Sequence, residues 1–188
     1  MNYLRGFIPW IAFAVVSSLG WQWGALAGLV IGAGLLVQQR KSGVDADALV
    51  LEGSTVVFFA GLTALSFARP HSALESYGGA LALGWLAVTA WVTVAVRRPF
   101  TTGIARRQAP REVWGTPLFR RINVVITAVW ATAFTLSAAA LAAVHAADLG
   151  DTASTAVQVA GFVLPAMFTA RYPERARARA LEQTAPRV

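Results

Sequence analysis

Few side chains of the types that catalyse reactions or bind metals occur in this sequence, and the clearest group surrounds its two histidines. His71 is followed by Glu75, and His145 by Asp148 and Asp151. Two imidazoles and three carboxylates could bind a divalent metal, and histidines can also be the axial ligands of a haem. However, neither histidine has a second one three or four residues away, and there is no C-x-x-C-H motif. Ordinary loop histidines are therefore the stronger interpretation, and a metal or haem site is the alternative.

Catalytic motifs are absent from the sequence. There is no G-x-S-x-G, no H-E-x-x-H and no P-loop. The chain has no cysteine, which excludes disulfides, thiolate metal sites and thiol catalysis. No charged side chain falls in the middle of a long apolar run, where such residues usually mark proton relays and ion pathways. We therefore expect no enzymatic activity and no cofactor.

Polar groups within the apolar runs are the remaining candidates for a ligand site. Most are hydroxyls, which can bond to the preceding turn of their own helix, whereas the amide of Gln158 needs partners on a neighbouring helix. Thr89, Thr127 and Gln158 would border a midplane cavity if the chain were a small-solute transporter or channel. Asn123 and Trp130 are further cavity candidates on the run that contains Thr127.

A basic connector, residues 97–121, lies between two long apolar runs and carries seven of the sixteen cationic side chains. Prolines divide it into short pieces, and aromatic residues alternate with the arginines. This composition suits a segment lying in the lipid headgroup layer, where guanidinium groups bind phosphates. An equally good interpretation is that these arginines only fix which side of the membrane the connector occupies. The lipid-phosphate or anion-binding candidates are Arg97, Arg98, Arg106, Arg107, Arg111, Arg120 and Arg121.

The elements that must position these residues are membrane helices. Apolar residues make up 56% of the chain, charged residues only 13%, and the mean hydropathy is +0.56, a balance that a water-soluble fold does not have. The net charge of +7 is distributed in short segments beside the apolar runs. This pattern favours the anionic inner leaflet as the partner, and not nucleic acid.

Six apolar segments predict an all-α, polytopic transmembrane bundle of three helical hairpins. A crossing needs about 20 residues at 1.5 Å each, so the first two segments are short, and the first hairpin is predicted to be short or re-entrant. Residues 1–172 form the transmembrane domain in this prediction, and 173–188 form a basic cytoplasmic tail. The segments are approximately 3–19, 21–37, 50–67, 77–96, 122–144 and 153–170.

The distribution of cations predicts the orientation. With the basic connector in the cytoplasm, fifteen of the sixteen cations are cytoplasmic and only Arg69 is outside, as the positive-inside rule favours. Both termini would then be cytoplasmic in a bacterial inner membrane. The first twenty residues lack a clean small-x-small cleavage site, so we expect them to be retained.

Glycines in the second segment predict a site of close helix packing. Gly24, Gly28 and Gly32 follow one another at intervals of four residues, so one helix face has no side chains and a second backbone can approach it. Packing within the monomer is the stronger interpretation, and a homodimer interface is the alternative.

Scattered landmarks in the sequence resemble a known family. The opening Phe7-Ile8-Pro9-x-x-x-Phe13, followed by the glycine-rich second segment, is similar to the start of the bacterial inner-membrane septation protein A (YciB-type) family. The resemblance covers most of the chain, but it includes no catalytic signature. The later landmarks are Arg98-Pro99-Phe100, Trp114, Asn123 and Trp130.

The resemblance implies a small inner-membrane protein with a structural or organising role in cell-envelope integrity or septation, with envelope or division proteins as partners. It implies no enzymatic activity and no cofactor. Pro9, Phe13 and the later landmarks are the residues to which a family role could be carried over. The basic connector departs from the family pattern because it is longer and far richer in arginine, which leaves any specific partner open.

Overall fold

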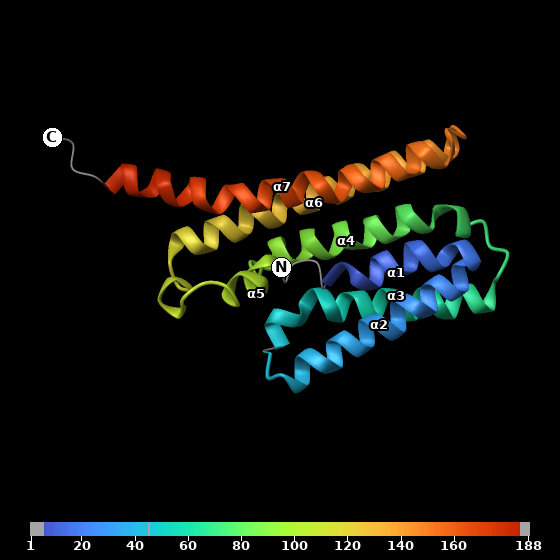
Figure 1. The fold of residues 1–188 in the computed structure, drawn as a ribbon, viewed down its shortest axis with the longest axis horizontal. Helices are drawn as coiled ribbons and strands as arrows, with labels where there is room; N and C mark the ends of the chain where they lie inside the picture. Colours follow the sequence, from blue (N-terminus) through green and yellow to red (C-terminus); the bar gives the residue numbers. More distant parts are fainter. Residues whose placement is uncertain (1–5, 45, 185–188) are drawn as a thin grey trace.

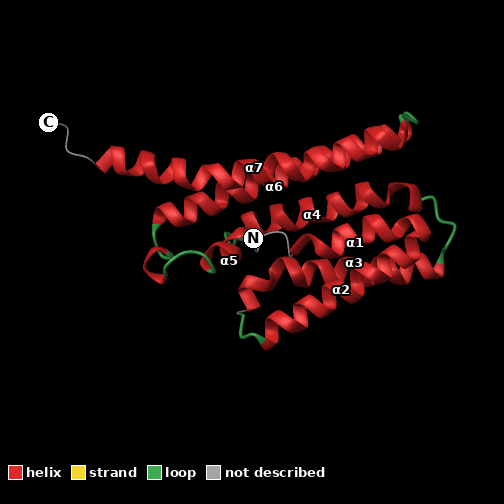
Figure 2. Cartoon of the chain, in the orientation of Figure 1, coloured by secondary structure: helices red, strands yellow, loops and turns green. Residues whose placement is uncertain are grey.

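The computed structural model describes residues 6–44 and 46–184, and this part of the chain is all-helical (Figure 1, Figure 2). It contains seven α-helices and no strand, with short 3₁₀ turns between some of the helices. The predicted all-α class is confirmed. The helices are α1 (Ile8–Val16), α2 (Trp21–Lys41), α3 (Val50–Ala68), α4 (Gly78–Ala95), α5 (Phe100–Arg106), α6 (Pro117–Ala146) and α7 (Gly150–Thr184).

Five of the helices, α2, α3, α4, α6 and α7, are long and apolar enough to cross a bilayer. They correspond to the second to sixth predicted segments and are consistent with a multi-pass membrane protein. The first predicted segment forms only a shorter apolar helix, Ile8–Leu19, and its residues 3–5 lie outside the described residues. Six crossings are therefore not confirmed.

Local sequence explains two of the helix boundaries. At the start of α6, the side chain of Thr116 accepts a hydrogen bond from the backbone N–H of Phe119 at 3.2 Å, and Pro117 occupies the first helical position, where its missing N–H costs nothing. Between α1 and α2, Gly20 has a φ of 127°, which residues with a side chain rarely adopt. The chain reverses there.

Helix α7 is continuous beyond the predicted domain boundary at residue 172. It contains Pro165 and Pro173 and still extends to Thr184, and its last part projects past the beginning of α6 (Figure 1). Neighbouring helices and local adjustment can tolerate proline in such helices. The predicted tail, 173–188, is thus helical up to Thr184, and its residues 185–188 lie outside the described residues.

The helices pack in an order that differs from three consecutive hairpins. Helix α4 packs along α6, and α6 packs along α7, while α2 packs along both α1 and α3 (Figure 1). Helices α3 and α4 follow one another in sequence but share few contacts. The predicted pairing of 50–67 with 77–96 is therefore not confirmed.

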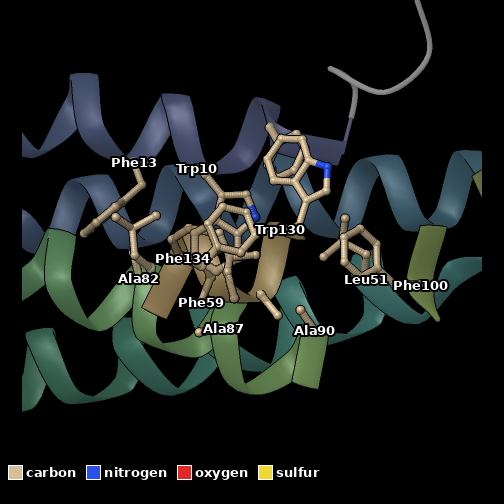
Figure 3. Close-up of a cluster of buried hydrophobic side chains, with 14 of the residues drawn as sticks. Trp10, Phe13, Leu51, Phe59, Ala82, Ala87, Ala90, Phe100, Trp130 and Phe134 are labelled. Carbon is tan, nitrogen blue, oxygen red and sulfur yellow. The ribbon is translucent and has the colours of Figure 1, made fainter. Parts of the chain in front are cut away.

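Aromatic side chains of α1 and of Phe7, the residue before it, join these two groups of helices at the centre of the bundle (Figure 3). The ring of Phe7 stacks on Trp130 of α6 with centroids 5.3 Å apart. On the other side, Trp10 lies 4.9 Å from the ring of Phe59 on α3. In an apolar solvent, such van der Waals packing replaces the hydrophobic effect as the source of helix association.

The glycine face of α2 packs within the chain. A Cβ atom at Gly28 would lie 2.6 Å from the ring of Phe59, and one at Gly24 would lie 2.9 Å from the carbonyl oxygen of Phe13. At Gly32 the nearest atom, in Thr55, would be 3.5 Å away, an ordinary contact. The closest approach of α2 to its neighbours is therefore at Gly24 and Gly28.

The bundle has two chemically different ends, which we name by their connections. The basic end holds the last turn of α2, helix α5 and the start of α6, and the turn end holds Gly20 and the turns 69–77 and 147–149. In Figure 1 the basic end is on the left and the turn end on the right.

Candidate functional site

Helix α5 turns part of the basic connector into a docked element at the basic end. Its residues Phe100, Thr101 and Gly103 are buried. A Cβ atom at Gly103 would lie 2.6 Å from the Cα atom of Ala48, so only glycine permits this approach of the two backbones. The connector is therefore anchored to the bundle at α5.

Hydroxyl groups hold α5 against α6. The hydroxyl of Thr101 lies 2.8 Å from that of Thr127 and donates to the backbone carbonyl of Asn123 at 3.1 Å. Since Thr101 has one proton to donate, the hydroxyl of Thr127 is the donor of the bond between them. The amide of Asn123 donates to the carbonyl of Phe119 at 2.9 Å. The structure thus places two cavity candidates, Thr127 and Asn123, in a buried junction between helices.

Beyond α5, the connector folds around Trp114. The guanidinium carbons of Arg106 and Arg111 lie 5.4 and 5.8 Å from the centre of its ring, within the range of cation–π attraction. The indole N–H donates to the carbonyl of Ala109 at 3.0 Å. Segment 107–116 consequently folds back on itself, with Arg111 placed against Trp114.

Six arginines of the connector, all except Arg106, form an exposed cationic surface. Within the described part of the chain, these six side chains form no ion pair with Asp or Glu, and the connector itself contains only one acidic residue, Glu112. Their charge is therefore available to an external anion. They are Arg97, Arg98, Arg107, Arg111, Arg120 and Arg121.

A small polar cavity of about 190 Å³ lies beside this surface. The amide of Gln39 donates to the carboxylate of Glu52 at 3.0 Å, while its own oxygen is buried without a hydrogen-bond partner in the described structure. Arg107 and Ile104 line the cavity from the connector. Sequence reasoning missed this cavity because its polar residues lie at the ends of separate apolar segments.

The proposed midplane cavity is not assembled from its three predicted residues. The hydroxyl of Thr89 lies 2.6 Å from that of Ser54 on α3, and Thr127 is bound to Thr101 on α5. Gln158 lines a separate cavity at the turn end. The structure therefore does not bring Thr89, Thr127 and Gln158 together.

The two histidines lie at the turn end of the bundle. His145 packs edge-on against Tyr77 with ring centroids 4.4 Å apart, and His71 is exposed. Among the residues that the structure describes, no group of three His, Cys, Asp or Glu side chains is placed to hold a metal ion. The predicted alternative of a metal or haem site gains no support from this geometry.

Tryptophan–hydroxyl pairs between helices are the main polar feature that sequence reasoning missed. In each pair an indole N–H of one helix donates to a hydroxyl of another, over distances of 2.8 to 3.2 Å. Trp130, a cavity candidate, belongs to this set. The sequence shows tryptophans and hydroxyls in apolar runs but not which of them meet. The pairs are Trp10–Thr55, Trp85–Ser54, Trp91–Thr135 and Trp130–Thr169.

Comparison with protein-family models, curated proteins and solved structures found no match. The resemblance to the septation protein A family therefore rests on the sequence landmarks alone.

Proposed function

We propose that the chain is a small integral inner-membrane protein with a structural or organising role in the cell envelope, and that it acts through its basic end. The observation that carries this proposal is the exposed cationic surface of the connector, six arginines without acidic partners in the described structure. Guanidinium groups bind phosphate oxygens bidentately, and the inner leaflet supplies such phosphates.

The aromatic packing at the centre of the bundle favours a role for the surface. Phe7, Trp10, Phe59, Trp130 and Phe134 occupy the centre of the bundle, and all five are nearly inaccessible. The hydroxyls of Thr89 and Thr127, two of the predicted cavity residues, are instead bonded to Ser54 and Thr101. A transporter would need an open route through this aromatic core, which makes it the weaker interpretation.

The continuation of α7 adds to the cationic end. Arg171, Arg175 and Arg179 follow one another four residues apart in a helix and are all exposed, so they share one face. In the proposed orientation, this face and the connector both meet the cytoplasmic leaflet, with both termini in the cytoplasm. Such a surface could recruit acidic segments of envelope or division proteins as well as lipid.

The family resemblance supports the envelope role, and the structure gives its landmarks positions. Pro99 and Phe100 lie at the start of α5, Trp114 is the centre of the folded connector, and Asn123 lies in the junction between α5 and α6. Four of the landmarks therefore cluster at the basic end, where we place the function.

The proposal is tested by complementation in a host lacking the gene. Loss of the protein is expected to increase the entry of dye into the cells and to disturb the placement of the septum. Wild-type protein is expected to reverse both defects. The triple variant Arg107→Gln, Arg111→Gln, Arg120→Gln should fail to reverse them, although it retains four connector arginines. The matched control replaces the same three arginines with lysine. This variant keeps the positive charge at each position and loses only the bidentate geometry of the guanidinium group.

Reconstitution of the protein into liposomes is a second experiment, which can contradict the proposed structural role. Purified protein in liposomes is expected to leave the permeability to small solutes unchanged. Saturable movement of a defined solute, or its chemical conversion, would overturn the structural role in favour of a transporter or an enzyme.

A further inference from the structure

A second cavity, at the turn end, has the composition of a cation-binding site. Its volume is about 230 Å³, and four aromatic side chains contribute to its wall. They come from three helices: Trp10 and Phe13 from α1, Trp21 from α2 and Phe162 from α7. Aromatic faces carry partial negative charge and attract organic cations.

Two of these rings are fixed by hydrogen bonds to residues that do not line the cavity. The indole N–H of Trp21 donates to the carbonyl of Pro70 at 2.9 Å, and that of Trp10 donates to Thr55 at 3.2 Å. Both indole donors are thus already used within the protein, so they are not free to donate to a ligand. Rings held in place before a ligand arrives lose little entropy on binding.

Among the polar residues that line the cavity, Glu75 carries a negative charge. Gln158 also lies on its wall, with an amide that can accept as well as donate hydrogen bonds. No Lys or Arg is among the described residues that line it. The turns at this end and the first turn of α7 contain Glu75, Asp148 and Asp151 against one cation, Arg69, so the local field also favours cations.

Two glycines keep the space open. A Cβ atom at Gly78 would lie 3.3 Å from the ring of Phe13, and one at Gly79 would lie 3.2 Å from Leu141 and 3.8 Å from Gln158. Side chains at these positions of α4 would press on the cavity wall. A volume of about 230 Å³ corresponds to about seven or eight water molecules at ~30 Å³ each, or an organic ion of about seven non-hydrogen atoms.

We propose that the turn-end cavity binds a small organic ammonium ion, which the aromatic rings surround and the carboxylate of Glu75 attracts. Quaternary ammonium groups are recognised by this combination of aromatic rings and negative charge. The ion is either a free solute or the headgroup of a phospholipid, since both present the same chemistry. The site lies at the opposite end from the cationic surface, so it goes beyond the proposed function and does not depend on it.

Choline and its neutral isostere 3,3-dimethyl-1-butanol test this proposal on the unaltered protein. Each is titrated by calorimetry into the full chain in nanodiscs of phosphatidylglycerol. We expect saturable binding of choline and binding of the alcohol that is weaker by about tenfold or more, because only choline carries the charge. Equal affinities, or no saturable binding of choline up to about 10 mM, would overturn the proposal.

Two charge-removing variants locate the site. Glu75→Gln is expected to weaken choline binding by about fivefold, and it is tolerated structurally because the side chain is exposed. Asp148→Asn removes the same charge at the same end, outside the cavity lining, and should change the affinity by less than about twofold. Equal weakening in both variants would indicate diffuse attraction and would overturn the assigned site.

Lipid composition distinguishes the two sources of the ion. Nanodiscs that contain phosphatidylethanolamine should weaken choline binding competitively if the headgroup occupies the cavity. Unchanged affinity in these nanodiscs would assign the cavity to a free solute. Both results are consistent with an ammonium-binding site in the cavity. The comparison of choline with its neutral isostere decides whether that site exists.

Discussion

The hydroxyls of Thr101 on α5 and Thr127 on α6 lie 2.8 Å apart in a site where both side chains are almost inaccessible. Thr101 also donates to the carbonyl of Asn123, so one side chain makes two bonds from the connector to the bundle. Buried polar groups cost free energy when they lose their partners. This pair therefore determines how firmly α5 is held, and with it the position of the arginines that follow.

Removing the hydroxyl of Thr101 should loosen the connector. Thr101→Val is nearly isosteric and leaves the hydroxyl of Thr127 and the carbonyl of Asn123 without this partner, at a cost of about 1–2 kcal/mol. Thr102→Val is the matched control on the same helix, since no side-chain hydrogen bond is described for Thr102. The thermal midpoint in detergent and the protease sensitivity of segment 107–116 measure the effect. Equal midpoints for both variants would contradict the role of Thr101.

Glycines of α2 should differ sharply in their tolerance of a methyl group. At Gly28 the new Cβ would lie 2.6 Å from Phe59, and a side chain in so tight a contact costs about 1–3 kcal/mol. At Gly34 no atom lies within 4 Å of the added Cβ, so alanine there should be neutral or stabilising by up to about 1 kcal/mol. We expect Gly28→Ala to lower the thermal midpoint and Gly34→Ala to preserve or raise it. Similar behaviour of the two variants would contradict the close packing at Gly28.

The indole of Trp85 should contribute to the limited contact between α3 and α4. Its N–H donates to the hydroxyl of Ser54 at 2.8 Å and to the backbone carbonyl of Ser54 at 3.1 Å. Trp85→Phe removes both bonds and is expected to cost about 1 kcal/mol in the free energy of unfolding. Trp23→Phe is the control, because Trp23 is half exposed and no hydrogen bond from its indole is described. Chemical denaturation in mixed micelles, followed by circular dichroism, compares the two variants.

Long apolar runs made most helices of this fold predictable, because a span of about 20 apolar residues has few alternatives in a membrane. Helix α5 was not predicted, since seven residues with two threonines and a glycine have no periodic signal. Its docking depends on the approach of Gly103 to Ala48, a contact between distant segments. The four-residue spacing of Arg171, Arg175 and Arg179 indicated a helical basic face in the tail, and α7 continues through Pro173 to Thr184.

The candidate site was predictable in composition but not in geometry. The arginines of the connector stand out in the sequence, and their exposure follows from their charge. Which cations surround Trp114, and which hydroxyls bind Thr101, depend on the folding of segment 107–116 and on helix neighbours. Sequence spacing within a single helix carries no information on these contacts between helices. The same limit applies to Thr89, Thr127 and Gln158, which the transporter alternative would bring together and which lie in three different places.

The orientation of the chain can be measured with single thiols, because the sequence contains no cysteine. Gln108→Cys places a thiol on an exposed position of the basic connector, and Ala73→Cys places one on an exposed position at the turn end. Transfer of so many guanidinium groups across lipid is prohibitive, so the connector should remain cytoplasmic. In intact cells a membrane-impermeant maleimide is therefore expected to label Ala73→Cys and not Gln108→Cys. Permeabilised cells should show labelling of both, which controls for thiol reactivity. Labelling of Gln108→Cys from outside would reverse the orientation, and the cationic surface would then face away from the anionic leaflet on which the proposed function depends.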